Sequence, residues 1–281
     1  MHTVAGRVAD ALDVEPIACR ELDGGMIGQV HRVDLADGSS VVAKTGETPL
    51  SIEGDMLRFL ETSSDLPVPT VYAASEDLLV IEYVAGDSTI TPAVARDAAD
   101  HLAALHETTA DAFGFEFDTL LGPLAQPNPW SERWLPFYRE HRLLRQARGA
   151  REDGPLDRDR FERLRSVADD LEALLREPDA PALIHGDVWR TNVLAADGEI
   201  QAFLDPAIYY AHPEIELAYV DWTDTFGDPF FERYRERRRI EPGFFERRRY
   251  VYRLYPLLVH VRLFGEQYLP GLDDALSTLG Y

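Results

Sequence analysis

A single lysine, Lys44, is the feature that most constrains how this chain of 281 residues can fold. Lysine and arginine together number 28, and every one except Lys44 is arginine. Lys44 closes an apolar run, residues 39–44, that predicts a β-strand. An ammonium is a compact point charge whereas a guanidinium is a wide planar fork, so lysine at this one position indicates a site that needs the compact cation. The fold must therefore bring the end of this strand to the group that the ammonium binds.

Two neighbouring segments indicate what that group is. Upstream, a glycine-rich turn containing Gly24, Gly25 and Gly28 separates two apolar runs, and downstream Glu53 falls in a helical pattern. A glycine loop over the phosphates, a strand lysine on them and a helix glutamate that holds the lysine follow one another in kinase-type ATP sites. We therefore expect these residues to bind ATP.

The first part of the chain predicts a small lobe of mixed structure. Apolar periodicity predicts helices over 4–12 and around 52–60, and strands over 17–22, 30–35, 39–44, 71–73 and 78–83. Residues 36–38 predict a hairpin turn between the second and third strands. Residues 80–86 then lead into a flexible segment, which we interpret as a hinge whose Glu82 and Val84 face the nucleotide. The expected lobes are 1–86 and 87–281.

The pattern after residue 90 is mostly helical. Helices are expected over 91–106, 131–148 and 156–176, with two or three more between 214 and 268. Residues 113–130, rich in glycine, proline and aromatic side chains, predict an ordered loop. A second hairpin turn at 196–198 joins strands at 192–194 and 200–204.

The second lobe also carries polar residues with the spacing that phosphoryl transfer requires. Asp187 is expected to accept the proton of a substrate hydroxyl or to orient it, and Asn192 reaches back to a magnesium ion. Asp205 follows a buried strand and is expected to chelate magnesium between the β- and γ-phosphates. The hairpin at 196–198 should bring these three residues together.

Two aromatic neighbours of this segment have open interpretations. His185 is read as a buried ring that positions the loop, with direct chemistry as the alternative. Trp189 is either a core aromatic or a ring that stacks on a sugar face.

Charge and composition exclude several classes of function. The net charge of −22 argues against nucleic acid as a partner, because phosphates would be repelled. Interleaved glutamates indicate that the arginine-rich runs 233–239 and 247–249 are solvated, ion-paired helix faces. Cys19 is the only cysteine, which excludes an intrachain disulfide. Without a long apolar run or a signal peptide, we expect no membrane association and a cytoplasmic protein.

The acidity itself has two explanations. Carboxylates in excess keep a surface hydrated in concentrated salt, where charge repulsion is screened within about 3 Å at 1 M, so the composition favours a halophilic origin. The alternative is a GC-rich genome that favours arginine codons.

The order of motifs resembles the aminoglycoside phosphotransferase and choline kinase-like group of the protein-kinase-like fold. Within this group the chain is similar to the fructosamine (ketosamine) 3-kinase family. The resemblance covers nearly the whole chain. It rests on Gly24, Gly25 and Gly28, Lys44 with Glu53, 113–115, 126–130 with Trp134, Phe137 and Tyr138, 185–189 with Asn192, 205–207, 209–214, 254–258 and 264–265. It implies an α+β bilobal fold with a five-stranded antiparallel N-lobe, one main helix in that lobe, and a mostly helical C-lobe.

The resemblance also implies a function. Members use ATP and Mg²⁺ to phosphorylate the sugar 3-hydroxyl of ketosamines of the fructosamine or ribulosamine type, and the unstable product releases the amine, which repairs glycated amines and proteins. A monomer or weak dimer is expected. A ketosamine presents a sugar ring and an ammonium, so we expect an aromatic surface and carboxylates around Asp187. Candidates are Trp189, Tyr209, His212 and Glu214, with Glu214 or a near neighbour holding the amine.

Three departures from the family pattern bear on substrate and regulation. Met26 stands where relatives carry a cysteine or small polar residue, so thiol regulation is not expected there; Arg190-Thr191 replaces small residues, and Glu216 replaces an aspartate. Two rival functions remain open. One is a kinase of the same fold acting on an aminoglycoside, choline or homoserine, and the other is an inactive nucleotide-binding module.

Overall fold

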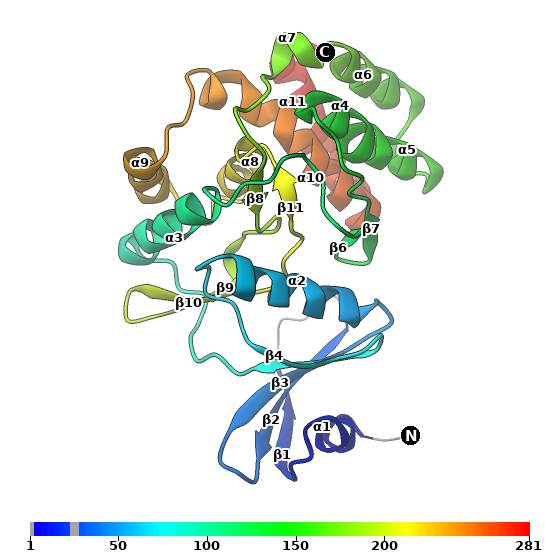
Figure 1. Ribbon diagram of the computed structural model, residues 1–281. Helices are drawn as coiled ribbons and strands as arrows, with labels where there is room; N and C mark the ends of the chain where they lie inside the picture. Colours follow the sequence, from blue (N-terminus) through cyan, green and yellow to red (C-terminus); the bar gives the residue numbers. More distant parts are fainter. Residues whose placement is uncertain (1–2, 23–27) are drawn as a thin grey trace.

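The computed structural model describes residues 3–22 and 28–281, which form a small and a large lobe (Figure 1). The small lobe contains α1 (Val4–Leu12), β1 (Pro16–Glu21), β2 (Gln29–Leu35), β3 (Ser40–Thr45), α2 (Leu50–Ser63), β4 (Val71–Ala74) and β5 (Leu78–Glu82). Gly24, Gly25 and Met26 lie outside the described residues, so the expected roles of the two glycines stay predictions.

The first half of the large lobe contains α3 (Pro92–Leu105), β6 (Thr119–Leu121), β7 (Leu124–Gln126), α4 (Trp134–Phe137), the π-helical η1 (Tyr138–Leu143), α5 (Leu144–Glu152), α6 (Arg158–Asp169) and α7 (Leu171–Leu174). The second half contains β8 (Ala182–Ile184), the 3₁₀ turn η2 (Arg190–Asn192), β9 (Val193–Ala196), β10 (Glu199–Phe203), β11 (Tyr209–Ala211), α8 (Glu214–Trp222), α9 (Asp228–Arg237), the π-helical η3 (Phe244–Arg248), α10 (Arg249–Phe264), the 3₁₀ turn η4 (Glu266–Tyr268) and α11 (Leu269–Leu279).

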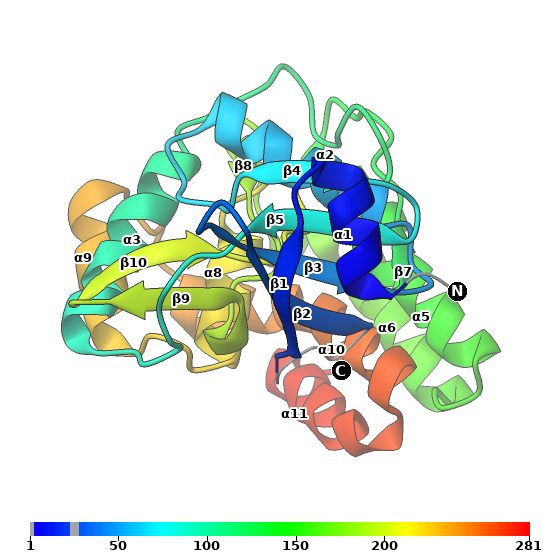
Figure 2. The same cartoon turned by 90° about the horizontal axis from the view of Figure 1, so that it is seen from below.

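The small-lobe sheet confirms the predicted five antiparallel strands with one main helix after the third. Its order is β1-β2-β3-β5-β4. Successive side chains of a strand point to opposite faces, so Val41 and Ala43 of β3 pack with Val8 of α1, while Val42 lies with Leu57 of α2 on the other face. Figure 2 shows α1 covering the outer face, and Figure 1 shows α2 between the sheet and the large lobe.

The same alternation directs Lys44. It shares the α2 face with Val42, and its backbone pairs with Val30 of β2 and Leu79 of β5. Because β3 is paired on both sides, the Lys44 side chain extends from a fixed backbone. Its ammonium therefore points toward α2 and the large lobe.

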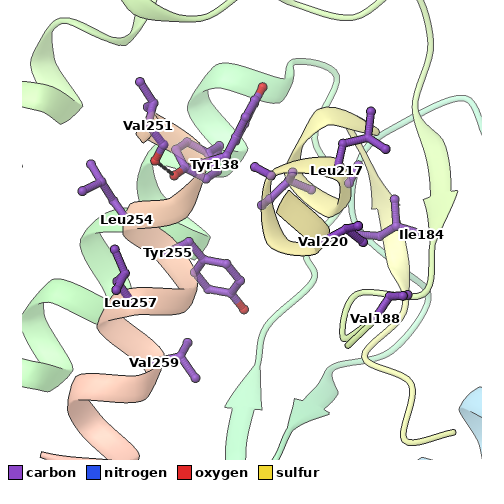
Figure 3. Packing of buried hydrophobic residues seen from close by; sticks show 14 of the residues in the cluster. Tyr138, Ile184, Val188, Leu217, Val220, Val251, Leu254, Tyr255, Leu257 and Val259 are labelled. Carbon is purple, nitrogen blue, oxygen red and sulfur yellow. Dashed lines mark hydrogen bonds between the residues drawn. The ribbon is translucent and has the colours of Figure 1, made fainter. Parts of the chain in front are cut away.

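The large lobe is built around α10, which packs against α5, α8 and α11. Tyr138 donates a hydrogen bond of 2.7 Å to the carbonyl of Val251 in the wall of this core (Figure 3). Two expectations were incomplete. The loop predicted over 113–130 contains the β6–β7 hairpin, and a further helix, α11, follows residue 268. Pro270 lies in the first turn of α11, where a missing N–H costs nothing, so its presence did not exclude a helix.

The predicted hinge is tied to the large lobe. Asp87 exchanges backbone hydrogen bonds of 3.0 and 2.7 Å with Ala195 of β9. The domain boundary at residue 86 stays a prediction.

The arginine-rich runs make ion pairs, as expected. Arg233 and Arg237 of α9 both bind Asp100 of α3. Arg248 differs from the expectation of a solvated face, because it is buried and pairs with buried Glu214. No helix in the described part of the chain has the length and apolar character needed to cross a membrane.

Candidate active site

A cleft of about 670 Å³ is lined by residues of both lobes. This volume lies in the range of small-molecule sites. Among the residues expected to bind nucleotide or substrate, the cleft is lined by Lys44, Glu53, Glu82, Val84, Asp187, Trp189, Asn192, Asp205 and Tyr209. His212 and Glu214 do not line it. Gly28 lies before β2 with φ +84°, and a Cβ there would meet the Thr45 carbonyl oxygen at 2.6 Å.

The Lys44 ammonium joins the two lobes. Its Nζ lies 2.6 Å from Glu53 Oε1 and also contacts the carboxylate of Asp205. Burial opposes the charge, but Asp205 and Glu53 outweigh it and raise the pKa of Lys44. Burial raises the pKa of Glu53, whereas the Lys44 ammonium outweighs desolvation and lowers that of Asp205. The ammonium is therefore held charged between two carboxylates.

The β9–β10 hairpin places Asp205 beside Asn192, as the spacing predicted. Asp197 and Gly198 both have positive φ, which matches the twist of a tight two-residue hairpin turn. The N–H of Leu204 then donates to the carbonyl of Asn192 at 2.8 Å. Asp205 itself adopts φ +53°, an uncommon backbone conformation that turns its carboxylate out of the strand direction.

Asp187 and Asn192 are in direct contact. Asn192 Nδ2 donates to Asp187 Oδ2 at 2.9 Å and to the Asp187 carbonyl at 3.0 Å. Burial raises the pKa of Asp187 to about 7. A carboxylate with a pKa near the working pH can take a proton from a bound hydroxyl and later release it.

Glycine is required immediately before Asp187. Gly186 has φ +87°, and a Cβ there would lie 2.3 Å from the carbonyl oxygen of Ala207. His185 is fully buried, and its Nδ1 accepts a 3.3 Å hydrogen bond from the Asp187 N–H. This contact agrees with the interpretation of His185 as a ring that positions the loop.

Sequence reasoning did not find the buried support behind this loop. Glu216 Oε1 accepts a 2.6 Å hydrogen bond from the Gly186 N–H, and Glu216 Oε2 lies 2.8 Å from His106 Nε2. His106 Nδ1 in turn lies 2.7 Å from the Tyr234 hydroxyl. The sequence signalled Glu216 only as a departure, interpreted as affecting substrate; here it orients the backbone next to Asp187.

The substrate side of the cleft has an aromatic wall. Trp189 is half-buried and lines the cleft, which favours the stacking interpretation over a core role. Tyr209 also borders the cleft, but only 1% of it is exposed, so its ring does not offer the stacking surface that was expected; the guanidinium of fully buried Arg142 lies 3.9 Å from the ring centroid. Arg142 is held by Asn128 Oδ1 at 2.6 Å.

Gln126 and Tyr255 were missed as site residues. Gln126 Nε2 donates to the Ala207 carbonyl at 3.0 Å, and Tyr255 donates to Gln126 Oε1 at 2.6 Å. They connect β7 and α10 to the segment that follows Asp205. In the sequence both positions belong to the family pattern, but their roles could not be assigned, because the contacts form only when distant segments pack.

The structure does not support the expected substrate roles of Glu214, the candidate for holding the amine, and of His212. Both oxygens of Glu214 accept hydrogen bonds from Arg248, at 2.7 and 2.5 Å, and the pair is buried. His212 Nδ1 accepts from the Glu214 N–H at the start of α8, and burial lowers the pKa of His212 to about 3. Both residues serve the packing of α8 instead of facing a ligand.

The oxygen atoms around the cleft suit a magnesium ion shared with phosphates. Magnesium usually takes one or two carboxylates and completes its shell with phosphates and water. Asp205, with 51% of its side chain exposed, and Asn192 supply such oxygens. In the described residues, no group of three or more His, Cys, Asp or Glu side chains is placed to hold a metal ion. A magnesium ion here would therefore need oxygen atoms of a bound nucleotide as well.

The arrangement of lobes, lysine and loop defines a phosphotransferase of the protein-kinase-like fold. An aminoglycoside phosphotransferase in ternary complex with ADP and hygromycin B matches the fold with a TM-score of 0.72 at 15% identity, over 99% of both chains. A Thermobifida fusca structure assigned as a fructosamine-3-kinase matches with a TM-score of 0.88 at 33% identity, over 99% of this chain and 98% of that one.

The family model described as fructosamine kinase matches residues 8–279, so the chain belongs to the fructosamine kinase family. The chloroplastic protein-ribulosamine 3-kinase of Arabidopsis thaliana is 31% identical over 86% of this chain and 78% of its own length. The probable ketoamine kinase of Pasteurella multocida is 31% identical over 86% of each chain. The expected family and fold are thereby confirmed.

Proposed function

We propose that the protein transfers the γ-phosphoryl group of ATP to the 3-hydroxyl of ketosamines of the fructosamine or ribulosamine type. Family membership supports the reaction class, and the name of the Arabidopsis relative includes a ribulosamine and a 3-kinase activity. The proposal rests mainly on one observation: Asp187, Asn192, Asp205 and Lys44 line the same cleft, and burial raises the pKa of Asp187 to about 7.

Each side chain has a task in this reaction. Lys44, held by Glu53, would neutralise charge on the α- and β-phosphates of ATP, with Asp205 freed from its contact with the ammonium. Asp205 and Asn192 would hold Mg²⁺, which when bound neutralises charge on the β- and γ-phosphates. Asp187 accepts a hydrogen bond from the substrate hydroxyl, aims it at the γ-phosphorus and takes its proton. Trp189 offers a face for the sugar, and buried Tyr209 supports the wall of the cleft behind the ligand.

Phosphorylation of an aminoglycoside, choline or homoserine is less well supported. The macrolide and aminoglycoside phosphotransferases among the structural neighbours share 15–18% identity with this chain and establish the fold alone. An inactive nucleotide-binding module is also disfavoured, because the catalytic positions among the described residues carry functional side chains.

The test is product mass after incubation with ATP, Mg²⁺ and synthetic fructosamines and ribulosamines, with choline, homoserine and an aminoglycoside as competitors. We expect one phosphoryl group on a ketosamine, followed by release of the free amine. Asp187→Asn, which keeps the shape and the contact to Asn192, should retain ATP binding and lose turnover by roughly 10²–10⁴-fold. Phosphate on a competitor and on no ketosamine would refute the proposal.

The same assay on a glycated protein decides whether macromolecular adducts are substrates. Removal of Mg²⁺ with a chelator should abolish turnover. The circular dichroism spectrum should stay the same, because the fold does not depend on the metal.

A further inference from the structure

The cleft continues beyond the catalytic residues to an apolar end. Leu120 and Leu121 of β6 line it together with Val259, His260, Leu263 and Phe264 of α10, a set that we call the distal wall. β6 and the C-terminal part of α10 thus border the same cleft. Figure 3 shows Val259 on the same side of α10 as Tyr255, the residue bonded to Gln126. The distal wall therefore adjoins the substrate side of the cleft.

The distal wall contains one polar side chain, His260. Its Nδ1 lies 2.8 Å from the carbonyl oxygen of Pro256, and because a carbonyl only accepts, Nδ1 must carry the hydrogen. Burial lowers the pKa of His260, so the ring is neutral near pH 7. Trp222 holds the ring edge-on, with centroids 4.9 Å apart. Nε2, the other ring nitrogen, is thus an acceptor with no hydrogen-bond partner in the described residues.

The distal wall carries no carboxylate. Among the described residues, the acidic ones that line the cleft are Glu53, Glu82, Asp187, Asp205 and Glu216. Glu53 and Asp205 bind Lys44, Asp187 binds Asn192, and Glu216 binds His106 and the Gly186 N–H. Glu82, at the end of β5, accepts a 3.3 Å hydrogen bond from the Thr70 N–H. A second positive charge on a substrate would therefore meet an apolar surface without a counter-ion, which is costly.

We propose that the distal wall receives the substituent on the ketosamine nitrogen and selects apolar, uncharged substituents. His260 Nε2 accepts a hydrogen bond from the substrate N–H, and Leu121, Leu263 and Phe264 pack on the carbon chain beyond it. This inference rests on the proposed ketosamine kinase activity and specifies the class of amine: alkyl or aromatic amines, in preference to amines that carry a second ammonium.

The test uses two ribulosamines with the same five-carbon chain, the adducts of pentylamine and of 1,5-diaminopentane, which differ by a terminal ammonium group. We expect the pentylamine adduct to have the higher kcat/KM by roughly tenfold or more, as for apolar groups that fill or miss a hydrophobic pocket. Equal values, or a preference for the charged adduct, would overturn this inference and leave the kinase activity intact. Failure to phosphorylate any ketosamine would refute both.

Leu263 and His260 provide matched variants. Leu263→Asp places a carboxylate on the distal wall and should reverse the preference for the uncharged adduct, whereas Leu263→Met should keep it.

His260→Phe keeps an aromatic ring and removes the acceptor, so KM should rise several-fold with kcat nearly unchanged. His260→Gln should restore part of the affinity. If the ring serves only packing against Trp222, phenylalanine would be tolerated and glutamine would not, which is the result that contradicts the assigned role.

Discussion

Replacement of Lys44 separates its structural from its catalytic contribution. In Lys44→Met, Glu53 and Asp205 lose the ammonium that both contact. Removal of one partner from a buried ion pair typically costs about 3–5 kcal/mol. Only 15% of the Glu53 side chain is exposed, but 51% of Asp205 is, so Asp205 can regain water. Because the contribution of Asp205 is reduced by its exposure to water, we expect a loss of about 2–3 kcal/mol in the free energy of unfolding at pH 8.

This loss should shrink in acid. The folded-state pKa of Glu53 is already raised by burial, and without the ammonium it rises further. Stability associated with a raised pKa is fully present below the unfolded value of about 4.3 and is lost as the pH rises through the folded value. The difference between wild type and Lys44→Met should therefore be smaller at pH 5.5 than at pH 8, by up to about 1.4 kcal/mol for each unit of additional pKa shift.

Lys44→Arg is the matched control. A guanidinium can reach both carboxylates, so stability should remain near that of the wild type, whereas turnover should fall nearly as far as in Lys44→Met, because a planar fork does not replace a point charge on the phosphates. Urea unfolding at the two pH values measures the first effect, and ATP-dependent phosphorylation measures the second. Full activity in Lys44→Arg, or a Lys44→Met variant whose stability difference is independent of pH, would refute the reasoning.

Three further outcomes are expected. Gly186→Ala should lower both turnover and stability, the latter by about 1–3 kcal/mol, because its Cβ would lie 2.3 Å from the Ala207 oxygen at φ +87°; wild-type kinetics would contradict this geometry. The pKa of Asp187, raised to about 7, predicts that kcat/KM rises with pH through neutrality, and a flat profile from pH 6 to about 8.5 would count against Asp187 as the base. Glu214→Gln should cost about 3–5 kcal/mol of stability by leaving Arg248 unpaired, with KM unchanged; a raised KM in a stable variant would restore its expected role at the amine.

The net charge of −22 adds an expectation about salt. If it reflects adaptation to high salt, the melting temperature should rise from about 0.1 M to molar salt as repulsion is screened. A melting temperature that stays level or falls would favour the codon-usage explanation.

Local sequence patterns were sufficient to predict the elements that carry the chemistry. The alternation of residues 41–44 determines that Lys44 shares a face with Val42, and the hairpin at Asp197-Gly198 determines that Asp205 returns beside Asn192. Such features depend on contacts between neighbouring segments, which short-range periodicity and turn chemistry encode. The motif order then identified the family.

Only the tertiary structure decided which polar groups remain available to a ligand. Glu214 looked like an amine ligand in the sequence, yet Arg248, distant along the chain, takes both of its oxygens. Glu216 looked like a substrate determinant and instead supports Gly186, while His260 had no motif and faces the cleft. A carboxylate or imidazole has the same identity whether it is paired or free. Its partner is determined by the packing of helices that are remote in sequence. Because a buried polar group without a partner is costly, the fold pairs such groups, and the sequence alone does not show with which residue.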